Sequence, residues 1–398
     1  MEFIAKEENK IGLLLWLSCF FSLLFLKAGV SNTLLFSALM FSFFKYSAWI
    51  HHVKLMPSFF WLPIVFVLFA ISSLTWSEVG PSHDVYEAIS HLKFVLLIPI
   101  FFLTLNRLSN YALENLLRGF YIFLAINVFL TLAAYAASIE LPGGASIKDR
   151  IFFGELTAIF ILWSFLLFLE CPQKKKKMLF FWSIVFSVFS IYFIEDGRTG
   201  YLLTLLAILY VLFLNREKIS NSRYLVLMII ILVIAGNVYG VFFGRAVGDN
   251  NVHQATGLSS LGIRSEMIKA GLLAFLDAPV LGHGLGSYRV VANELTGGVY
   301  HFWNNPHSYL ILLLVEFGIV GTLVALAFSY KLVCYGEKSV TKNFFIGFCL
   351  LIMFDSIVNS TFFDMHPGYL YALLIALGVV FVSRKIDLIE VFTPKQAS

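Results

Sequence analysis

A histidine at the start of a long apolar run is the first residue whose position suggests chemistry. Residues 304–309 read Asn-Asn-Pro-His-Ser-Tyr, and a continuous apolar stretch follows them. Asn305 is suited to cap a helix and Pro306 to open it, so we expect His307 in the first helical turn. The helix dipole would then lower the pKa of His307 and keep its imidazole neutral. A neutral imidazole can act as a general base. A histidine that only caps and anchors the helix fits the same spacing equally well.

Three arginines are candidates for binding a phosphate group. Arg198 lies in the short polar segment 195–200, and Arg264 and Arg289 lie in a long polar segment further along the chain. A guanidinium group binds phosphate through two parallel hydrogen bonds. Two arginines that converge at the depth of the lipid headgroups would suit the diphosphate of a polyprenyl-linked substrate. For Arg198, simple contact with lipid headgroups is the alternative.

The elements that must position these residues are helices in a bilayer. The chain is 59% hydrophobic and 13% charged, whereas soluble domains are about 45–50% apolar and about 25% charged. This composition excludes a soluble enzyme, a nucleic-acid binder and a disordered chain. A transmembrane barrel would show short alternating segments, but the apolar runs here are continuous. We therefore predict an all-α polytopic membrane protein, with residues 1–398 forming a single integral membrane domain.

About twelve apolar runs are candidate transmembrane helices, and several of them are short for a span. They are residues 11–26, 28–44, 59–75, 92–105, 115–137, 151–169, 178–194, 201–214, 224–243, 307–330, 343–361 and 368–382. In this prediction residues 244–306 form one large loop between the ninth and tenth helices, and the loop contains short helices. Residues 264–276 have helical periodicity and are expected to lie along the membrane interface.

The positive charges orient these predicted helices. With a cytoplasmic N-terminus, most of the 28 lysines and arginines fall on the cytoplasmic side, including the run Lys174–Lys177. This agrees with the positive-inside rule. Both termini are then cytoplasmic and loop 244–306 lies on the outer side of the membrane. The positive residues that break the rule collect at the outer face, beside His307.

The sequence contains little evidence for a metal site or for redox chemistry. It contains no P-loop and no metal-ligand spacing of cysteine and histidine, and its four cysteines suggest no disulfide framework. Glu195 and Asp196 could hold a divalent cation, but a local salt bridge to Arg198 is the favoured interpretation. We expect no metal and no cofactor.

Several other polar or glycine residues are expected to have structural roles. Glu316 and Asp355 lie in apolar runs, where a carboxylate is costly, so we expect them to be buried polar partners. Gly318 and Gly321 would form a small-residue packing patch on one continuous helix. The glycine-rich segment 281–288 predicts a turn.

The histidine segment resembles a signature of the bacterial O-antigen ligases. His307-Ser308, nine residues, and then Gly318-x-x-Gly321-Thr322 is similar to H-[NSQ]-x9-G-x-x-G-T. Segments 196–200 and 262–286 resemble further motifs of the O-antigen ligase/polymerase superfamily. The resemblance runs over residues 190–330, which would form the core of the superfamily domain.

The resemblance implies a glycosyltransferase of lipopolysaccharide biosynthesis in the bacterial inner membrane, with its active site facing the periplasm. Such ligases transfer a glycan from undecaprenyl diphosphate to a sugar hydroxyl of the lipid A–core oligosaccharide. By this resemblance His307 is the base, and Arg198 and Arg264 bind the diphosphate. Arg289 and Arg150 are extensions by charge and by side of the membrane. The implied partners are the glycan donor, the lipid A–core acceptor and membrane lipids, without nucleic acid.

Three alternatives stay open. An O-antigen polymerase of the same superfamily would transfer to another polyprenyl-linked glycan; the nine-residue spacing and the large loop favour the ligase. A protein O-oligosaccharyltransferase would use a serine or threonine hydroxyl. A twelve-span secondary transporter would show repeat symmetry and polar sites at the midplane, whereas the polar residues here collect at one face.

Overall fold

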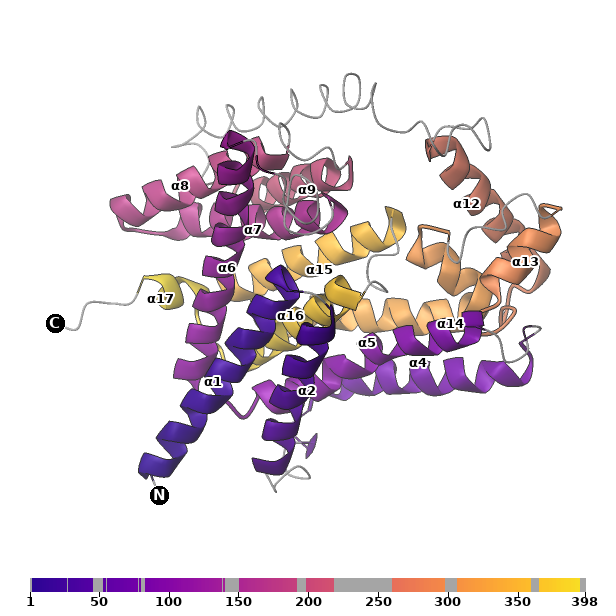
Figure 1. Cartoon of the computed structure of the whole chain (residues 1–398), viewed down its shortest axis with the longest axis horizontal. Helices are drawn as coiled ribbons and strands as arrows, with labels where there is room; N and C mark the ends of the chain where they lie inside the picture. Colours follow the sequence, from indigo (N-terminus) through magenta and orange to yellow (C-terminus); the bar gives the residue numbers. More distant parts are fainter. Residues whose placement is uncertain are drawn as a thin grey trace.

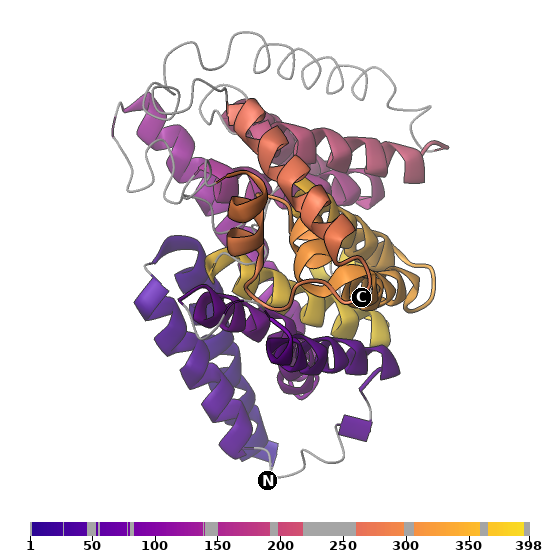
Figure 2. The ribbon, with the colours of Figure 1, turned by 90° about the vertical axis from the view of Figure 1, so that its right-hand side faces the viewer.

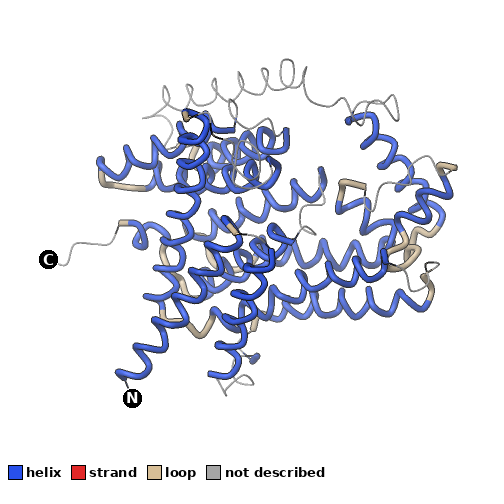
Figure 3. The backbone as a smooth tube through the Cα atoms, viewed as in Figure 1, coloured by secondary structure: helices blue, strands red, loops and turns tan. Residues whose placement is uncertain are grey.

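A computed structural model describes residues 2–26, 28–45, 53–54, 56–77, 79, 83–137, 139, 150–191, 198–217, 260–297, 306–358 and 365–393. Within these ranges the regular elements are all helices and no strand is present (Figures 1 and 3). The all-α prediction is therefore confirmed for this part of the chain. The predicted span 224–243, the acidic pair Glu195-Asp196 and the predicted cap Asn305 lie outside the described residues.

The helices follow the predicted apolar runs closely, because every predicted span except 224–243 falls on one of them. The elements are α1 (Glu2–Phe25), α2 (Ala28–Lys45), η1 (Ser58–Phe60), α4 (Trp61–Ser72), η2 (Ser73–Thr75), α5 (His83–Leu105), α6 (Asn110–Ala136), α7 (Arg150–Glu170), α8 (Lys174–Phe189), α9 (Arg198–Leu214), α12 (Ser260–Asp277), α13 (Tyr288–Leu295), α14 (Tyr309–Cys334), α15 (Val340–Val358), α16 (Met365–Ser383) and α17 (Leu388–Phe392).

Several of these helices can cross a bilayer. Among the described residues, five segments are long and apolar enough: Ser58–Thr75, Asn110–Ala136, Phe152–Glu170, Tyr309–Cys334 and Val340–Ile357. Shorter apolar helices cover parts of α1, α2, α5, α9 and α16. The chain is thus a multi-pass membrane protein; the number of twelve spans and the topology stay predictions.

Helix α7 is the most buried of the five candidate spans. It is apolar on all sides, as a helix surrounded by protein must be, and 94% of the stretch Phe152–Glu170 is buried. It packs against α8, α9 and α15. Its carboxylate Glu155 is buried and accepts a hydrogen bond from the hydroxyl of Tyr371 in α16. That bond offsets part of the cost of burying a carboxyl group.

Different helices lie at the two ends of the molecule. The start of α1 and the short helix α17 lie at the left in Figure 1, whereas α12 and α13 lie at the right. Helix α17 is held there because Arg118 and Lys176 donate to the carbonyls of Val391 and Phe392, at 2.6 and 2.7 Å. In Figure 2 the right-hand end of Figure 1 faces the viewer, and α12 and α13 lie in front of the bundle. These two helices carry Arg264 and Arg289.

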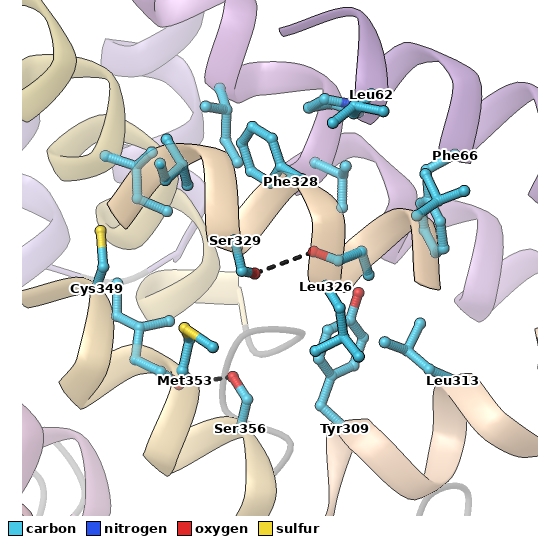
Figure 4. Close-up of a pocket in the computed structure, with 18 of the residues that line it drawn as sticks. Leu62, Phe66, Tyr309, Leu313, Leu326, Phe328, Ser329, Cys349, Met353 and Ser356 are labelled. Atoms are coloured by element: carbon cyan, nitrogen blue, oxygen red, sulfur yellow. Dashed lines mark hydrogen bonds between the residues drawn. The ribbon is translucent and has the colours of Figure 1, made fainter. Parts of the chain in front are cut away.

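Helix α14 is broken at Gly318, where φ is 58° and ψ is −159°. Its first arm is Tyr309–Phe317 and its second arm is Ile319–Cys334. In a straight helix Tyr309 and Phe328 would lie about 28 Å apart, yet both line one cavity of about 180 Å³. Figure 4 shows Tyr309 beside Leu326. The second arm therefore folds back toward the first, and the prediction of one continuous helix over residues 307–330 was wrong.

Candidate functional site

The glycine-rich turn at residues 279–284 supplies the hydrogen bonds that the break in α14 removes. In a continuous helix, the amides of Ile319 and Val320 would donate to the carbonyls of Val315 and Glu316. Here the turn accepts from those amides and donates to those carbonyls. The four bonds are Ile319 N to Pro279 O at 2.9 Å, Val320 N to Val280 O at 3.2 Å, His283 N to Val315 O at 2.9 Å and Gly284 N to Glu316 O at 2.9 Å. We call residues 279–284 and 315–320 together the glycine lock.

Only glycine fits at three positions of the lock, and one of them is Gly284, where φ is 91° and a Cβ atom would lie 2.8 Å from the carbonyl oxygen of Ser73. Gly318 has φ 58°, and a Cβ atom there would lie 2.4 Å from the carbonyl oxygen of Val280. Gly282 has φ 69°, and its Cβ atom would lie 2.5 Å from the carbonyl carbon of Glu316. All three positive φ values are ones that residues with side chains rarely adopt. The expected role of Gly318 as a packing residue on a continuous helix is corrected: it reverses the chain.

Side chains tie the lock to its surroundings. The amide of Leu285 donates to the hydroxyl of Ser73 in η2 at 2.9 Å. The buried ring of His283 forms a hydrogen bond with the carbonyl of Ala274 in α12 at 2.9 Å. The hydroxyl of Ser287 donates to the carbonyl of Gly284 at 2.7 Å. The turn therefore joins α12, α14 and the end of α4.

His307 lies just outside α14. The residue that precedes the helix is Ser308, whose backbone is extended, and the helix starts at Tyr309. His307 itself has φ 48°, in the left-handed region. The prediction that Pro306 opens the helix and that His307 lies in its first turn was wrong. A non-glycine residue in this conformation stores strain and is found most often at functional sites.

The pKa of His307 is lowered, as predicted, but for a different reason. Burial is the larger cause, because it disfavours the charged imidazolium, and the positive charge of Arg264 adds to it. The fold thus brings together the predicted base and one predicted phosphate-binding arginine. The neutral imidazole that a general base requires follows from this environment.

Close packing of α12 on the first arm of α14 creates this pairing. A Cβ atom on Gly271 would lie 2.3 Å from the side chain of Ile311, so the two helices touch at that glycine. Arg264 precedes Gly271 along α12, and His307 precedes Ile311 along the chain. The buried cluster behind them contains Ala270, Ala274, Tyr288, Val291, Ala292, Ile311, Leu312 and Val315.

Arg289 belongs to the same unit. It follows the buried Tyr288 in α13, whose hydroxyl donates to the carbonyl of Met267 in α12 at 3.2 Å. Arg289 is half-buried. The unit formed by α12, α13 and the first arm of α14 therefore carries Arg264, Arg289 and His307.

The other two arginines begin neighbouring helices. Helix α7 starts at Arg150 and α9 starts at Arg198. The helices touch near these starts, because a Cβ atom on Gly154 would lie 2.8 Å from the Cα atom of Gly200, and the reverse holds too. The starts of α7 and α9 therefore lie side by side. The side chains of Arg150 and Arg198 are outside the described part of the chain.

Sequence reasoning missed the apolar cavity that begins at Tyr309. Both arms of α14 line it, together with parts of α4, α5, α15 and α16 (Figure 4). Tyr309 follows His307 by two residues, so the cavity begins beside the candidate base. Only the position of Gly318 could have signalled it, since the cavity exists because the helix folds back there.

Part of the chain matches a known protein family. Residues 182–326 match the family described as O-antigen ligase. The chain matches no curated protein. The matched segment contains Arg198, Arg264, the whole glycine lock and His307. Residues 182–326 are therefore a domain of the O-antigen ligase/polymerase superfamily.

Proposed function

We propose that this protein is an O-antigen ligase of lipopolysaccharide biosynthesis. It transfers a glycan from undecaprenyl diphosphate to a sugar hydroxyl of the lipid A–core oligosaccharide, at the periplasmic face of the inner membrane. The observation that carries the proposal is the pairing of a half-buried His307 with Arg264, inside the segment that matches the ligase family. This match favours the ligase over a transporter.

His307 acts as the general base. Its lowered pKa keeps the imidazole neutral at the ordinary pH of the periplasm, so it accepts the proton of the acceptor hydroxyl. The hydroxyl oxygen then attacks the anomeric carbon of the donor sugar. The bond between that carbon and the diphosphate oxygen breaks, and undecaprenyl diphosphate leaves. The proton stays on His307 until solvent removes it.

The arginines stabilise the leaving diphosphate. Arg264 is close enough for its charge to act on His307, so it lies at the site where negative charge develops. Arg289 is on the same unit, and Arg198 begins α9 near the start of α7. Guanidinium groups bind phosphate oxygens in pairs and take the role that a metal ion has in other transferases.

The apolar cavity beside Tyr309 suits part of the lipid chain of the donor. Its wall includes leucine and phenylalanine side chains from α4 and α14, such as Leu62, Phe66, Leu313 and Leu326. The diphosphate would lie at Arg264 and the first isoprene units in the cavity, which places the reacting bond near His307.

The decisive experiment replaces His307 with alanine. We expect the variant to lose glycan transfer to lipid A–core, while glycan bound to undecaprenyl diphosphate accumulates in cells. Lys269→Ala, an exposed change on α12, is the control and should leave transfer unchanged. Collapse of the glycan to single repeat units in the His307→Ala strain would favour the polymerase instead.

The role of metal is tested separately. We expect the purified protein to transfer glycan in the presence of excess chelator. Loss of transfer that a divalent cation restores would instead assign a metal-binding role to Glu195 and Asp196.

A further inference from the structure

An exposed apolar surface runs from α12 across the glycine-rich turn onto the second arm of α14. We call it the α12–α14 strip; it consists of Leu273, Leu276, Val280, Ile319 and Leu323, whose exposed fractions are 55%, 68%, 58%, 48% and 56%. Large apolar side chains this exposed to water are costly. The strip is a single surface, because the turn and the second arm share the backbone hydrogen bonds of the glycine lock.

One end of the strip lies on an apolar helix arm. Ile319 and Leu323 belong to the second arm of α14, Ile319–Cys334, within a segment whose composition is apolar enough for a bilayer. Exposed leucines on such a helix contact lipid. The carbonyl of Val280 accepts a hydrogen bond from the amide of Val320, so the turn lies against the second arm. Lipid that contacts Leu323 therefore also contacts the turn.

Aromatic contacts indicate how deep in the membrane the strip lies. Phe317, next to Gly318, packs against Phe69, and Phe69 packs against Trp76 at the outer end of α4. Tryptophan is enriched where a bilayer meets water. The break in α14 therefore lies near the membrane interface, on the side of the molecule where α12 is found.

Exposed leucines lie toward the C-terminal end of helix α12. Up to Lys269 the exposed positions are Ser265, Ile268 and Lys269, and Lys269 forms an ion pair with Glu266 at 2.5 Å. After Lys269 the exposed positions are Leu272, Leu273, Leu276 and the last residue of the helix, Asp277. A helix that lies flat on a bilayer has its apolar residues along one side. This distribution suits a helix that enters the bilayer with its C-terminal end first.

We propose that the second half of α12 and the glycine-rich turn insert into the outer leaflet, where the α12–α14 strip contacts lipid acyl chains. Helix α12 is then a re-entrant element instead of part of a water-exposed loop. The insertion holds Arg264, in the first half of the helix, at the depth of the lipid headgroups. The inference concerns the position of α12 and does not depend on the proposed reaction.

Fluorescence quenching tests the insertion. Leu276→Cys is labelled with bimane in the full chain, in a Cys334→Ser background because Cys334 is exposed and the other three cysteines are buried. The protein is placed in phosphatidylcholine vesicles with brominated acyl chains. Lys269→Cys is the matched control, since it lies two turns earlier on the same side of α12, and Leu323→Cys is the lipid-facing reference. Leu273→Cys replaces Leu276→Cys if that variant does not fold.

We expect the probe at position 276 to lose fluorescence in brominated vesicles about as much as the probe at position 323. The probe at position 269, at the level of the headgroups with Arg264, should instead be reached by iodide from the water and be little quenched by the brominated chains. Equal quenching by iodide at positions 276 and 269 would overturn the insertion. Protection of position 276 from both quenchers, with cross-linking between copies of the chain, would overturn it in favour of a protein contact.

Discussion

Two pairs of glycines hold the candidate site, and they work differently. Gly154 and Gly200 are ordinary helical residues that let α7 and α9 approach until a Cβ atom would lie 2.8 Å from the facing Cα atom. Gly282 and Gly318 have positive φ values and let two main chains exchange hydrogen bonds. The first pair positions the helix starts at Arg150 and Arg198. The second pair positions the unit that carries Arg264 and His307.

The difference shows what each contact depends on. At α7 and α9 the requirement is small volume, so a larger side chain pushes the helices apart while leaving each helix intact. At the glycine lock the requirement is backbone conformation, so a larger side chain also removes the chain reversal and the four hydrogen bonds. Gly318→Ala, Gly200→Ala and Ser287→Ala test this distinction, and Arg264→Gln tests the unit that the second pair positions.

The largest effect is expected for Gly318→Ala. Gly318 combines a positive φ with an extended ψ, and this conformation costs any residue with a side chain about 1–3 kcal/mol. The added Cβ atom would also collide with the carbonyl of Val280. We expect transfer to be lost and the melting temperature in detergent to fall. The control is Gly297→Ala, where φ is 64° but no heavy atom lies within 4 Å of the added Cβ. Equal losses in both variants would show that φ alone matters and that the lock does not.

The second effect is expected for Gly200→Ala. Separating α7 and α9 should cost about 1–3 kcal/mol, and displacing the start of α9 should lower transfer by about tenfold to a hundredfold. The control is Gly29→Ala in α2, where an added Cβ meets nothing within 4 Å. That control should be stabilised by about 0.5–1 kcal/mol. Normal transfer by Gly200→Ala would remove this contact from the site.

The third effect concerns pH and is measured on Arg264→Gln. The neutral form of His307 is the active one, so transfer falls as the pH drops through the pKa of His307. Arg264 lowers that pKa, and its removal raises it, which should move the acid limb of the pH profile to higher pH. Arg264→Lys keeps the charge and should keep the limb while impairing transfer. Lys269→Gln removes an exposed charge from the same helix and should leave the limb in place.

The smallest effect is expected for Ser287→Ala. The change removes the hydrogen bond from the Ser287 hydroxyl to the carbonyl of Gly284, worth about 1 kcal/mol. The backbone bonds of the lock remain, so transfer should stay close to that of the unchanged protein. A loss as large as that of Gly318→Ala would mean that side chains, and not the main chain, maintain the lock.

Most of the helical framework could be predicted because apolar length alone defines it. The predicted run 151–169 is α7 (Arg150–Glu170), and the predicted loop helix 264–276 lies inside α12 (Ser260–Asp277). The glycine-rich turn was also predicted as a turn. These features depend on local composition, which a single sequence displays directly.

The break in α14 could not be predicted, because its cause lies elsewhere in the chain. The run Tyr309–Cys334 contains no proline and no cluster of polar residues, so it reads as one helix. The groups that satisfy the broken helix come from Pro279 to Gly284, more than thirty residues earlier. The environment of His307 was missed for the same reason, since both its burial and its arginine neighbour follow from the packing of α12.

The glycine lock also has a consequence for how this region of the sequence can change. Four main-chain hydrogen bonds join the turn to α14, and a main-chain bond is indifferent to the side chain it carries, apart from proline at a donor. Residues such as Val280 and Leu281 are therefore restricted mainly by the environment that their side chains face, whereas Gly282, Gly284 and Gly318 cannot be exchanged. Random substitution at residues 280 and 281 should recover a wide range of apolar residues beside unchanged glycines at 282, 284 and 318.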